Sequence, residues 1–491
     1  MIGSWTRREF LELSAVAVSA PAARRAEEPP ELPGLTIADA AQQIRTRRLS
    51  PVELTDLVLQ RIAALDGKVG AFVTVAGDQA LTAARDAERE IQRGRLRGPL
   101  HGIPVAVKDT YYTRDIRTTA GSRILEHFVP DADSTIVERL KAAGAILIGK
   151  TNLPEFSFGG YTPGCNNPWD LSRNAGGSSG GSAAALAASM VLGACGGDTS
   201  GSIRNPASAC GVVGLKPTFG LVSRHRVVPI SWTLDHLGPM ANTVADAAIL
   251  LNAIAGHDRL DRYSAQVLVP DYRRGLSRSL RGLRVGVIAP RHIDQFHADV
   301  KVAFSAAVDV IAGLGARVLE IAFPARMEAG DAIQRVIRIS EAAAYHRRFL
   351  IGPDRDRYYR EGERPGPGGP SVRTSVEAGS LLTAAQYLQA QRARSVFIDD
   401  MKGVYEPIDV LLSPTLPAVA DVAISPSHTY RTWWNVTGYP AISIPCGFSR
   451  TPAGLPIGLQ ISAKPFQDAL VLAVAHAYER ATDWHTRRAR L

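Results

Sequence analysis

We predict an α/β fold in which a largely internal sheet is covered by helices on both faces. Two observations lead to this prediction. Runs of continuous apolar residues as long as a strand recur along the chain, and amphipathic or capped helix patterns separate them. A strand that is apolar on both sides belongs to a sheet with both faces covered, because a half-exposed strand would alternate polar and apolar residues.

The helices and strands follow from local signals. Thr36 to Asp39 and Ser50 to Glu53 have the capping-box pattern, and proline at the first helical position supports the second start. Gly144 and Gly313 stand where a helix should end. The predicted helices begin at residues 36 and 50 and span residues 134–143, 183–190, 298–312 and 468–481, the last as a surface helix. The predicted strands span residues 103–107, 145–148, 284–289, 317–321, 410–412, 441–444 and 455–460.

The first thirty residues differ from the rest. Arg7 and Arg8 precede a short Ala/Val-rich run and several alanines that suit a cleavage site, a pattern that resembles a twin-arginine export signal. We therefore predict that residues 1–30 form a signal peptide and linker, that residues 31–491 form one domain, and that the protein is exported. An amphipathic N-terminus on a cytoplasmic protein is the alternative.

Composition and charge exclude several classes of function. The net charge is +9, but basic residues alternate with acidic ones and form no block, so we expect no nucleic-acid partner. No apolar run long enough to span a membrane follows the N-terminal segment. The four cysteines form no CxxC pair and no zinc-like Cys/His cluster, so we predict free buried thiols and no metal site.

Residues 174–218 carry the strongest chemical signal of the chain. Two Gly/Ser-rich loops flank the predicted helix 183–190. Glycine turns of this kind aim several backbone N–H groups at one point, which is how an oxyanion is held, and serines in such turns can act as nucleophiles. The continuation after Ile203 argues against a flexible linker, and the absence of Gly-Lys-Ser/Thr argues against a phosphate-binding loop.

Several motifs in a fixed order resemble the amidase signature family over residues 35–485, with the signature core at residues 100–240. The matching segments are Gly102–Asp109, Gly176–Ser182, Asp198–Arg204, Cys210–Thr218 and Gly454–Gln460. The resemblance implies a single large α/β/α sandwich domain with a mixed, mostly parallel central sheet. It also implies an amidase that hydrolyses a small-molecule carboxylic acid amide to the acid and ammonia or an amine, without cofactor or metal. A homodimer is common in the family.

The resemblance further implies a Ser–Ser–Lys triad with an acyl-enzyme intermediate. Carried over residue by residue, Ser202 is the nucleophile, Ser178 is the bridging serine after a cis Gly177–Ser178 peptide, and Lys108 is the base. A lysine accepts a proton only when it is neutral, and burial at the end of an apolar strand lowers its pKa as this role requires. The backbone N–H groups expected to form the oxyanion hole are those of Thr199, Ser200, Gly201 and Ser202.

Other polar and aromatic residues have two possible roles. His101 or His236 with Asp235 would make a Ser–His–Asp triad, but no Gly-x-Ser-x-Gly elbow surrounds the predicted nucleophile, and we prefer the lysine. Asp198 and Arg204 either bind substrate or form a buried pair that supports the loop, and we favour the pair. Ser179 and Ser182 are expected to be structural. The aromatic residues that either line a pocket or pack in the core are Trp433, Trp434 and Tyr439.

Ser200 departs from the family pattern, which usually has glycine there. If this position needs a positive φ, serine adds strain of ~1 kcal/mol and narrows the oxyanion loop. The departure motivates one alternative, a catalytically silent amide-binding protein. Another alternative, also within the family, is the A subunit of a glutamyl-tRNA amidotransferase. The substrate stays open among aryl, aliphatic and amino-acid amides, and esters.

Overall fold

The structure is a computed structural model that describes residue 32 and residues 34–363, 370–420 and 430–491. The predicted signal peptide and linker, residues 1–30, lie outside the described residues. Within the described part of the chain, no helix combines the length and the apolar character that crossing a bilayer requires.

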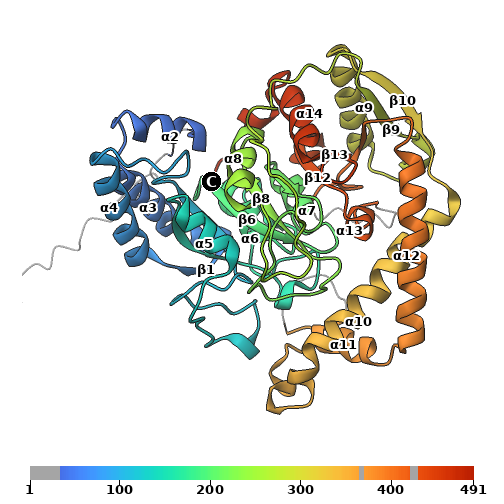
Figure 1. The fold of residues 1–491 in the computed structure, drawn as a ribbon, viewed down its shortest axis with the longest axis horizontal. Coiled ribbons are helices and arrows are strands. Elements are labelled where there is room, and N and C mark those ends of the chain that lie inside the picture. The colour runs from blue at the N-terminus through green and yellow to red at the C-terminus, as the bar shows by residue number, and fades with distance from the viewer. Residues whose placement is uncertain (1–31, 33, 364–369, 421–429) are drawn as a thin grey trace, which may run out of the picture.

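One sheet of eleven strands runs through the molecule (Figure 1). In spatial order the strands are β1 (Phe72–Val75), β3 (Ile146–Thr151), β2 (Pro104–Lys108), β6 (Gly193–Asp198), β8 (His236–Ala241), β7 (Val213–Lys216), β12 (Ala441–Arg450), β13 (Ala453–Ala463), β11 (Val410–Pro414), β9 (Arg284–Ile288) and β10 (Arg317–Ile321). A separate pair consists of β4 (Asn166–Asn167) and β5 (Asp170–Asn174). Because β2 and β6 are parallel neighbours, their carboxyl ends bring Lys108 and Asp198 to the same edge of the sheet.

The sheet is mixed, but antiparallel pairs outnumber parallel ones among the described strands. Parallel pairing joins β3 to β2, β2 to β6, β11 to β9 and β9 to β10. The other six neighbouring pairs are antiparallel. Only residues 451–452 separate β12 from β13, and so short a connection joins only antiparallel strands. The predicted α/β fold with a mixed sheet is confirmed, with a smaller parallel share than expected.

Helices cover both faces of this sheet. Successive strand residues face opposite sides, and in β6 Gly193 faces Leu250, whereas Gly196 faces Ser179 and Ile203. The helices on the Leu250 side are α8 (Val244–Ile254) and its neighbours α2 (Ile37–Arg45), α5 (Thr135–Ala142) and α14 (Asp468–Arg480). The helices on the Ser179 side are α6 (Gly180–Ala187) and α7 (Arg204–Cys210). The remaining helices are α3 (Pro51–Val69), α4 (Gly77–Gln92), α9 (Ala298–Gly313), α10 (Gly330–Leu350), α11 (Val372–Ser380), α12 (Ala384–Val404) and α13 (Trp433–Thr437).

Helices α10, α11 and α12 form a layer beside the sheet, coloured yellow to orange in Figure 1. Helix α10 contacts α11, α12 and the short α13. No sequence pattern that we used predicts this layer, which turns out to supply one wall of the site described below.

Local signals predict several elements well. Ser50 caps α3 and Glu53 closes the capping box, and β10 has the predicted bounds.

Helix α14, in contrast, is not the surface helix that its pattern suggests. Leu472 and Val474 are buried because α14 packs against α8 as well as against β12 and β13. A helix with neighbours on two sides needs more than one apolar stripe.

Candidate active site

Two buried side chains from distant parts of the sequence meet at the carboxyl end of β2. Lys108 is the last residue of this strand, and its Nζ donates a hydrogen bond to Ser178 Oγ over 2.8 Å. Ser178 lies just before α6 and follows a cis peptide bond from Gly177. Both side chains are fully buried. The structure therefore brings together the residues predicted as base and bridging serine.

Burial controls the charge of Lys108. It lowers the pKa of the ammonium group from 10.5 to about 7, because surroundings of low dielectric constant disfavour the charged form. The carboxylates of Asp235 and Asp198 act in the opposite direction and keep the pKa from falling further. A large fraction of Lys108 is therefore neutral near pH 7 and able to accept a proton.

The segment around Ser178 is held by close packing and by hydrogen bonds. Ser179 Oγ bonds to both the N–H and the C=O of Gly197, and Ser182 Oγ shares a hydrogen bond with a threonine of β3. A Cβ at Gly181 would lie 2.3 Å from the backbone nitrogen of Asn152, so only glycine fits there. Ser179 and Ser182 thus have the structural roles predicted for them.

Ser202 lies in the loop between β6 and α7 and lines a cavity of about 240 Å³. It is 8% exposed, whereas Ser178 is 0% exposed, so of these two serines only Ser202 reaches the cavity. The N–H of Ser179 donates to the C=O of Ser202 over 3.1 Å. This backbone bond joins the segment of Ser178 to the loop of Ser202. Among the described residues, the side chains of Ser178 and Ser202 are not hydrogen-bonded to each other.

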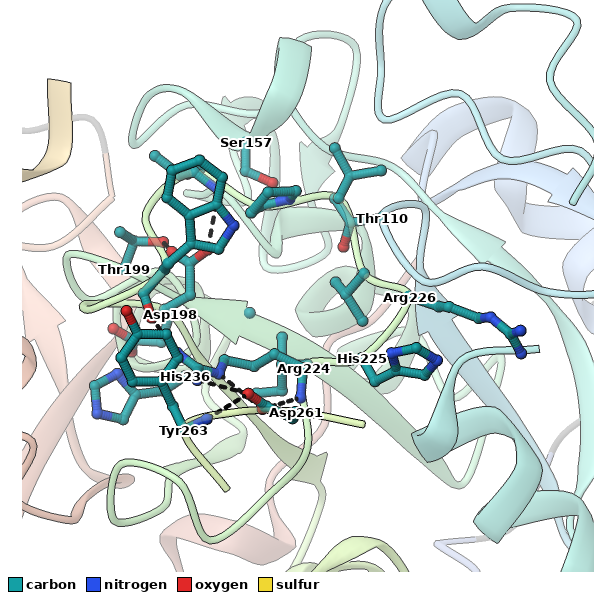
Figure 2. Close-up of a pocket in the computed structure, with 18 of the residues that line it drawn as sticks. Thr110, Ser157, Asp198, Thr199, Arg224, His225, Arg226, His236, Asp261 and Tyr263 are labelled. Atoms are coloured by element: carbon teal, nitrogen blue, oxygen red, sulfur yellow. Dashed lines mark hydrogen bonds and ion pairs between the residues drawn. The ribbon is translucent and has the colours of Figure 1, made fainter. Parts of the chain in front are cut away.

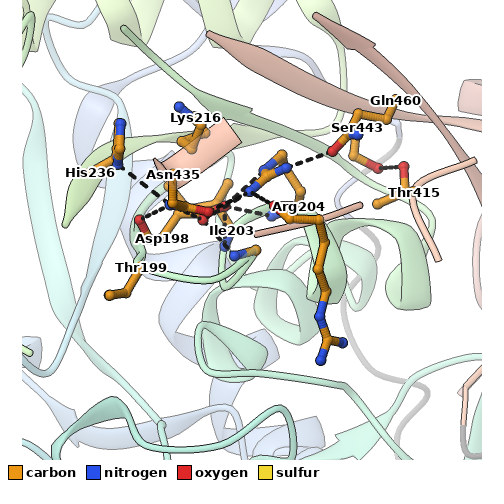
Figure 3. A network of polar contacts seen from close by, with 12 residues as sticks. Asp198, Thr199, Ile203, Arg204, Lys216, His236, Thr415, Asn435, Ser443 and Gln460 are labelled. Carbon is orange, nitrogen blue, oxygen red and sulfur yellow. Dashed lines mark hydrogen bonds and ion pairs between the residues drawn. The ribbon is translucent and has the colours of Figure 1, made fainter. Parts of the chain in front are cut away.

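One carboxylate shapes the loop that carries Ser202 (Figure 3). Asp198 accepts hydrogen bonds from the N–H groups of Gly201 at 2.7 Å and Ile203 at 3.2 Å. Arg204 pairs with the same carboxylate over 3.0 Å, and both side chains are fully buried. Burial alone would raise the pKa of Asp198, but the ion pair with Arg204 brings it below its usual range. Asp198 and Arg204 therefore form the supporting pair that we favoured.

The last third of the chain completes this support. Asn435 Nδ2 donates to the Asp198 C=O over 2.7 Å, and the Arg204 guanidinium donates to Gln460 Oε1 over 2.6 Å. It also donates to the C=O of Arg431 over 2.8 Å. Sequence reasoning missed Asn435 and Gln460 as supports, because neither lies near the loop in the chain.

The backbone N–H groups of the loop divide into two sets. The N–H of Gly201 is bonded to Asp198 and is not free to bind a substrate oxygen, contrary to the prediction. The N–H groups of Thr199, Ser200 and Ser202 donate to no described residue, and all three residues line the cavity. Three of the four N–H groups expected in the oxyanion hole therefore have no partner among the described residues.

Ser200 carries no backbone strain. Its φ is not positive, whereas the φ of Gly201 is 102°. The strain and the narrowing of the loop were expected only if this position needed a positive φ, and it does not. Ser200 Oγ instead accepts a hydrogen bond from Gln334 Nε2 over 2.6 Å, and the same amide reaches the C=O of Thr199 at 3.3 Å. Gln334 thus ties α10 to the loop that carries Ser202.

Two cavities meet at this loop. Ser202 lines the smaller one, and Lys108 lines a second of about 420 Å³ (Figure 2). In the larger cavity Arg224 pairs with Asp261 over 3.0 Å and lies over the rings of Phe219 and Tyr263. The residues that line both cavities are Ser157, Thr199 and Ile230. The predicted base and the predicted nucleophile thus face adjoining spaces.

The described residues hold no Ser–His–Asp triad. The Asp235 carboxylate accepts a hydrogen bond from Thr199 Oγ1 over 2.6 Å. His236 Nδ1 lies 2.7 Å from a backbone carbonyl, and burial holds the pKa of His236 well below its ordinary value. His101 lies beside Glu90, away from the loop.

The remaining candidates have structural roles. Trp433, Trp434 and Tyr439 are buried in the core and line none of the cavities described here. All four cysteines are buried free thiols. In the part of the chain that the structure describes, no group of three His, Cys, Asp or Glu side chains is arranged to hold a metal ion.

Helix α10 presents a polar stripe that sequence reasoning missed. Asp331, Gln334, Arg335 and Arg338 have the i, i+3, i+4, i+7 spacing of one helical face, and all four line the cavity beside Ser202. The signal exists in the sequence as a polar face opposite buried isoleucines. A helix face that is simply exposed to solvent has the same pattern, so the sequence alone does not distinguish a cavity wall from an ordinary surface.

Comparisons with known proteins identify the family of the chain. The family model described as Amidase matches residues 53–472. The chain is similar to the A subunit of the glutamyl-tRNA(Gln) amidotransferase of Geobacter sp., at 40% identity over 94% of this chain and 100% of that protein. The same subunit of Chloroflexus aurantiacus is 42% identical over 94% of this chain and 99% of that protein. The native peptide amidase of Stenotrophomonas maltophilia has a similar structure, with a TM-score of 0.80, 32% identity and coverage of 93% and 97% of the two chains.

The family match includes every residue placed in the site above, from Lys108 to Gln460, and the relatives cover nearly the whole chain. The chain belongs to the amidase family and is an enzyme that acts on carbon–nitrogen bonds.

Proposed function

We propose that the chain hydrolyses a carboxamide through an acyl-enzyme on Ser202, with Ser178 as the proton relay and Lys108 as the base. The observation that carries the proposal is the 2.8 Å hydrogen bond between the Lys108 ammonium nitrogen and Ser178 Oγ at a fully buried position. A buried lysine with a pKa of about 7 is a base suited to neutral pH.

The reaction follows from these groups. Neutral Lys108 takes the proton of Ser178, which takes that of Ser202 as Ser202 Oγ bonds to the amide carbon. The free N–H groups of Thr199, Ser200 and Ser202 stabilise the oxyanion, each worth ~3 kcal/mol in the transition state. The proton returns through Ser178 to the nitrogen as the C–N bond breaks. Water then attacks the acyl ester along the reverse path and restores the Ser202 hydroxyl.

Labelling with a fluorophosphonate tests the nucleophile. We expect intact-mass measurements to detect a single adduct on the parent protein, no adduct on Ser202→Ala and slow formation on Ser178→Ala. A fluorophosphonate reacts only with an activated serine, so the test does not require the substrate to be known. Ser179→Ala is the matched control, since Ser179 bonds to Gly197 and takes no part in the relay. An unlabelled parent would favour the catalytically silent binder.

The pH profile tests the base. Because the neutral form of Lys108 is required and its pKa is about 7, kcat/KM should fall about tenfold for each pH unit below about 7 and level off above it. We would measure kcat/KM on an amide substrate from pH 5 to pH 9. A rate that stays flat down to about pH 5 contradicts lysine as the base.

A second function is favoured by one specific observation. The Geobacter and Chloroflexus relatives, 40% and 42% identical across nearly the whole chain, are both named as the A subunit of a glutamyl-tRNA(Gln) amidotransferase. The chain would then release ammonia as one member of an assembly. This function shares the proposed hydrolytic chemistry and differs in the fate of the ammonia.

Cell fractionation of the tagged full-length chain separates the two functions. Recovery outside the cytoplasm, shortened at the proposed signal of residues 1–30 and without partner proteins, supports an exported amidase. Recovery in the cytoplasm together with further subunits supports the amidotransferase. Reconstitution with purified glutamyl-tRNA(Gln) and those subunits would then show whether the ammonia reaches the tRNA-bound glutamate.

A further inference from the structure

The cavity beside Ser202 is lined by more positive than negative side chains. Arg335, Arg338 and Arg431 line it, and Asp331 is the one carboxylate among its described lining residues. Asp331 accepts a hydrogen bond from Thr432, and its carboxylate attracts the Arg431 guanidinium, so it offsets one of the three positive charges. The wall of the cavity therefore carries an excess of cationic side chains close to the predicted nucleophile.

Arg338 differs from the arginines that support the fold. Two of those arginines form ion pairs with carboxylates: Arg204 with Asp198, and Arg224 with Asp261. Two others, Arg139 and Arg394, donate hydrogen bonds to backbone carbonyls. Within the described part of the chain, Arg338 has no hydrogen bond or ion pair, only the ring of Phe158 5.3 Å from its guanidinium carbon. An aromatic face cannot satisfy five N–H donors.

Arg431, which also lines the cavity, repeats this situation. Its Nε is buried and has no hydrogen-bond partner among the described residues, while its backbone C=O accepts from Arg204. Burial lowers the pKa of Arg338 to about 10 and lowers that of Arg431, but both side chains stay charged at pH 7. Both side chains are partly exposed at the cavity wall. Because neither guanidinium is hydrogen-bonded to a described residue, both are available to a partner that arrives with the ligand.

Taking the proposed function as given, we propose that this cavity selects small carboxamides that carry a free carboxylate, namely half-amides of short dicarboxylic acids, and that Arg338 and Arg431 bind that carboxylate. A planar guanidinium matches a carboxylate in two parallel hydrogen bonds. The cavity of about 240 Å³ has room for a molecule of this size. In the larger cavity, Arg224 is already paired with Asp261 and Arg226 with Glu138.

Matched substrate pairs test the charge preference. We would compare malonamate, succinamate and glutaramate with the neutral amides in which an isopropyl group replaces the carboxylate. The best half-amide should exceed its neutral partner in kcat/KM by roughly 10- to 100-fold, as expected for a charge-assisted hydrogen bond that the neutral partner lacks. Equal kcat/KM values across every pair overturn the inference.

Variants assign the preference to residues. Arg338→Gln should reduce the ratio of the two kcat/KM values at least tenfold, and Arg431→Gln should reduce it as well. Arg347→Gln is the matched control, because Arg347 is an exposed arginine of the same helix and should leave the ratio unchanged. A ratio that falls equally in the Arg347 variant overturns the assignment. If Arg338→Gln does not fold, the Arg431 variant decides.

A protection measurement separates this inference from the proposed function. Succinate or glutarate should slow fluorophosphonate labelling of Ser202 in the parent protein and protect Arg338→Gln much less. Labelling without any protection by either dianion overturns the carboxylate site and leaves the proposed chemistry intact. A parent protein that is never labelled overturns the proposed function instead.

Discussion

Replacing Lys108 by methionine is expected to lower kcat/KM about a thousandfold while stabilising the folded protein. The loss follows from removing the general base, a role typically worth 10²–10⁴ in rate. The gain follows from burial, because folding transfers this lysine from water to a site where its ammonium form is disfavoured. Opposite effects on activity and stability would mark a group kept for chemistry rather than for the fold.

The stability gain has a defined pH dependence. In the unfolded chain Lys108 binds a proton up to its ordinary pKa of 10.5, whereas in the folded chain it does so only up to about 7. The unfolded state therefore binds more protons between these values, and the stability of the parent rises across this window by about 1.4 kcal/mol per pH unit. At pH 7 the buried lysine costs on the order of 4 kcal/mol, of which about 1 kcal/mol is offset by its hydrogen bond to Ser178. Methionine should thus stabilise by about 3 kcal/mol at pH 7, and the gain should vanish as pH approaches 10.5.

Urea unfolding of both proteins at pH 7 and pH 10 measures this difference. Lys402→Met is the control, since the Lys402 side chain is 64% exposed and its substitution should change stability by less than about 0.5 kcal/mol. A gain of the same size at both pH values would mean that better packing, not the lysine charge, accounts for it. No gain at either pH would contradict the buried neutral lysine.

Replacing Arg204 by methionine is expected to lower the free energy of unfolding by about 3–5 kcal/mol. The substitution leaves the Asp198 carboxylate buried without its cation, which is far more costly than losing an exposed ion pair. It also frees Gln460 Oε1 and Asn435 Oδ1, both of which accept from the guanidinium. We also expect labelling of Ser202 to be lost, because Asp198 holds the N–H groups of the same loop.

Two further variants make this result interpretable. Arg89→Met removes an exposed partner of Asp86 and should cost less than about 1 kcal/mol. The double variant Asp198→Asn with Arg204→Met should be more stable than the sum of the single changes predicts, because no unpaired charge remains. Chemical denaturation of the parent, Arg89→Met, Arg204→Met, Asp198→Asn and the double variant gives the five free energies. A cost for Arg204→Met as small as that for Arg89→Met would contradict the supporting role of the pair.

Sequence signals predict what depends on nearby residues. The capping box at Ser50 and the strand that ends at Lys108 have only local requirements, and the structure has both. The glycines of the segment Gly193–Asp198 instead predict a loop, because glycine disfavours strands. The segment is nevertheless a central strand, since its glycines admit Ser179 on one face and Leu250 on the other. Packing decides this element, and no short window of sequence contains that information.

In the candidate site too, the sequence predicts some features, and distant residues determine the others. The motifs locate the segments of Lys108, Ser178 and the loop after Asp198, and the structure brings the first two into contact. They do not reveal that Gly201 donates its N–H to Asp198, or that Gln334 bonds to Ser200. Those bonds depend on how the loop turns and on where α10 lies, which distant residues determine.

The support that Asn435 and Gln460 give to the loop also sets when the enzyme becomes able to work. A ribosome makes the chain from its N-terminus, so Lys108, Ser178 and Ser202 emerge well before the two residues that complete the Asp198–Arg204 support. A nascent chain of about half length contains every reacting group but not the bonds that order them. On the proposed mechanism, we therefore expect amide cleavage to begin only near the end of synthesis and truncated products of the chain to be inert.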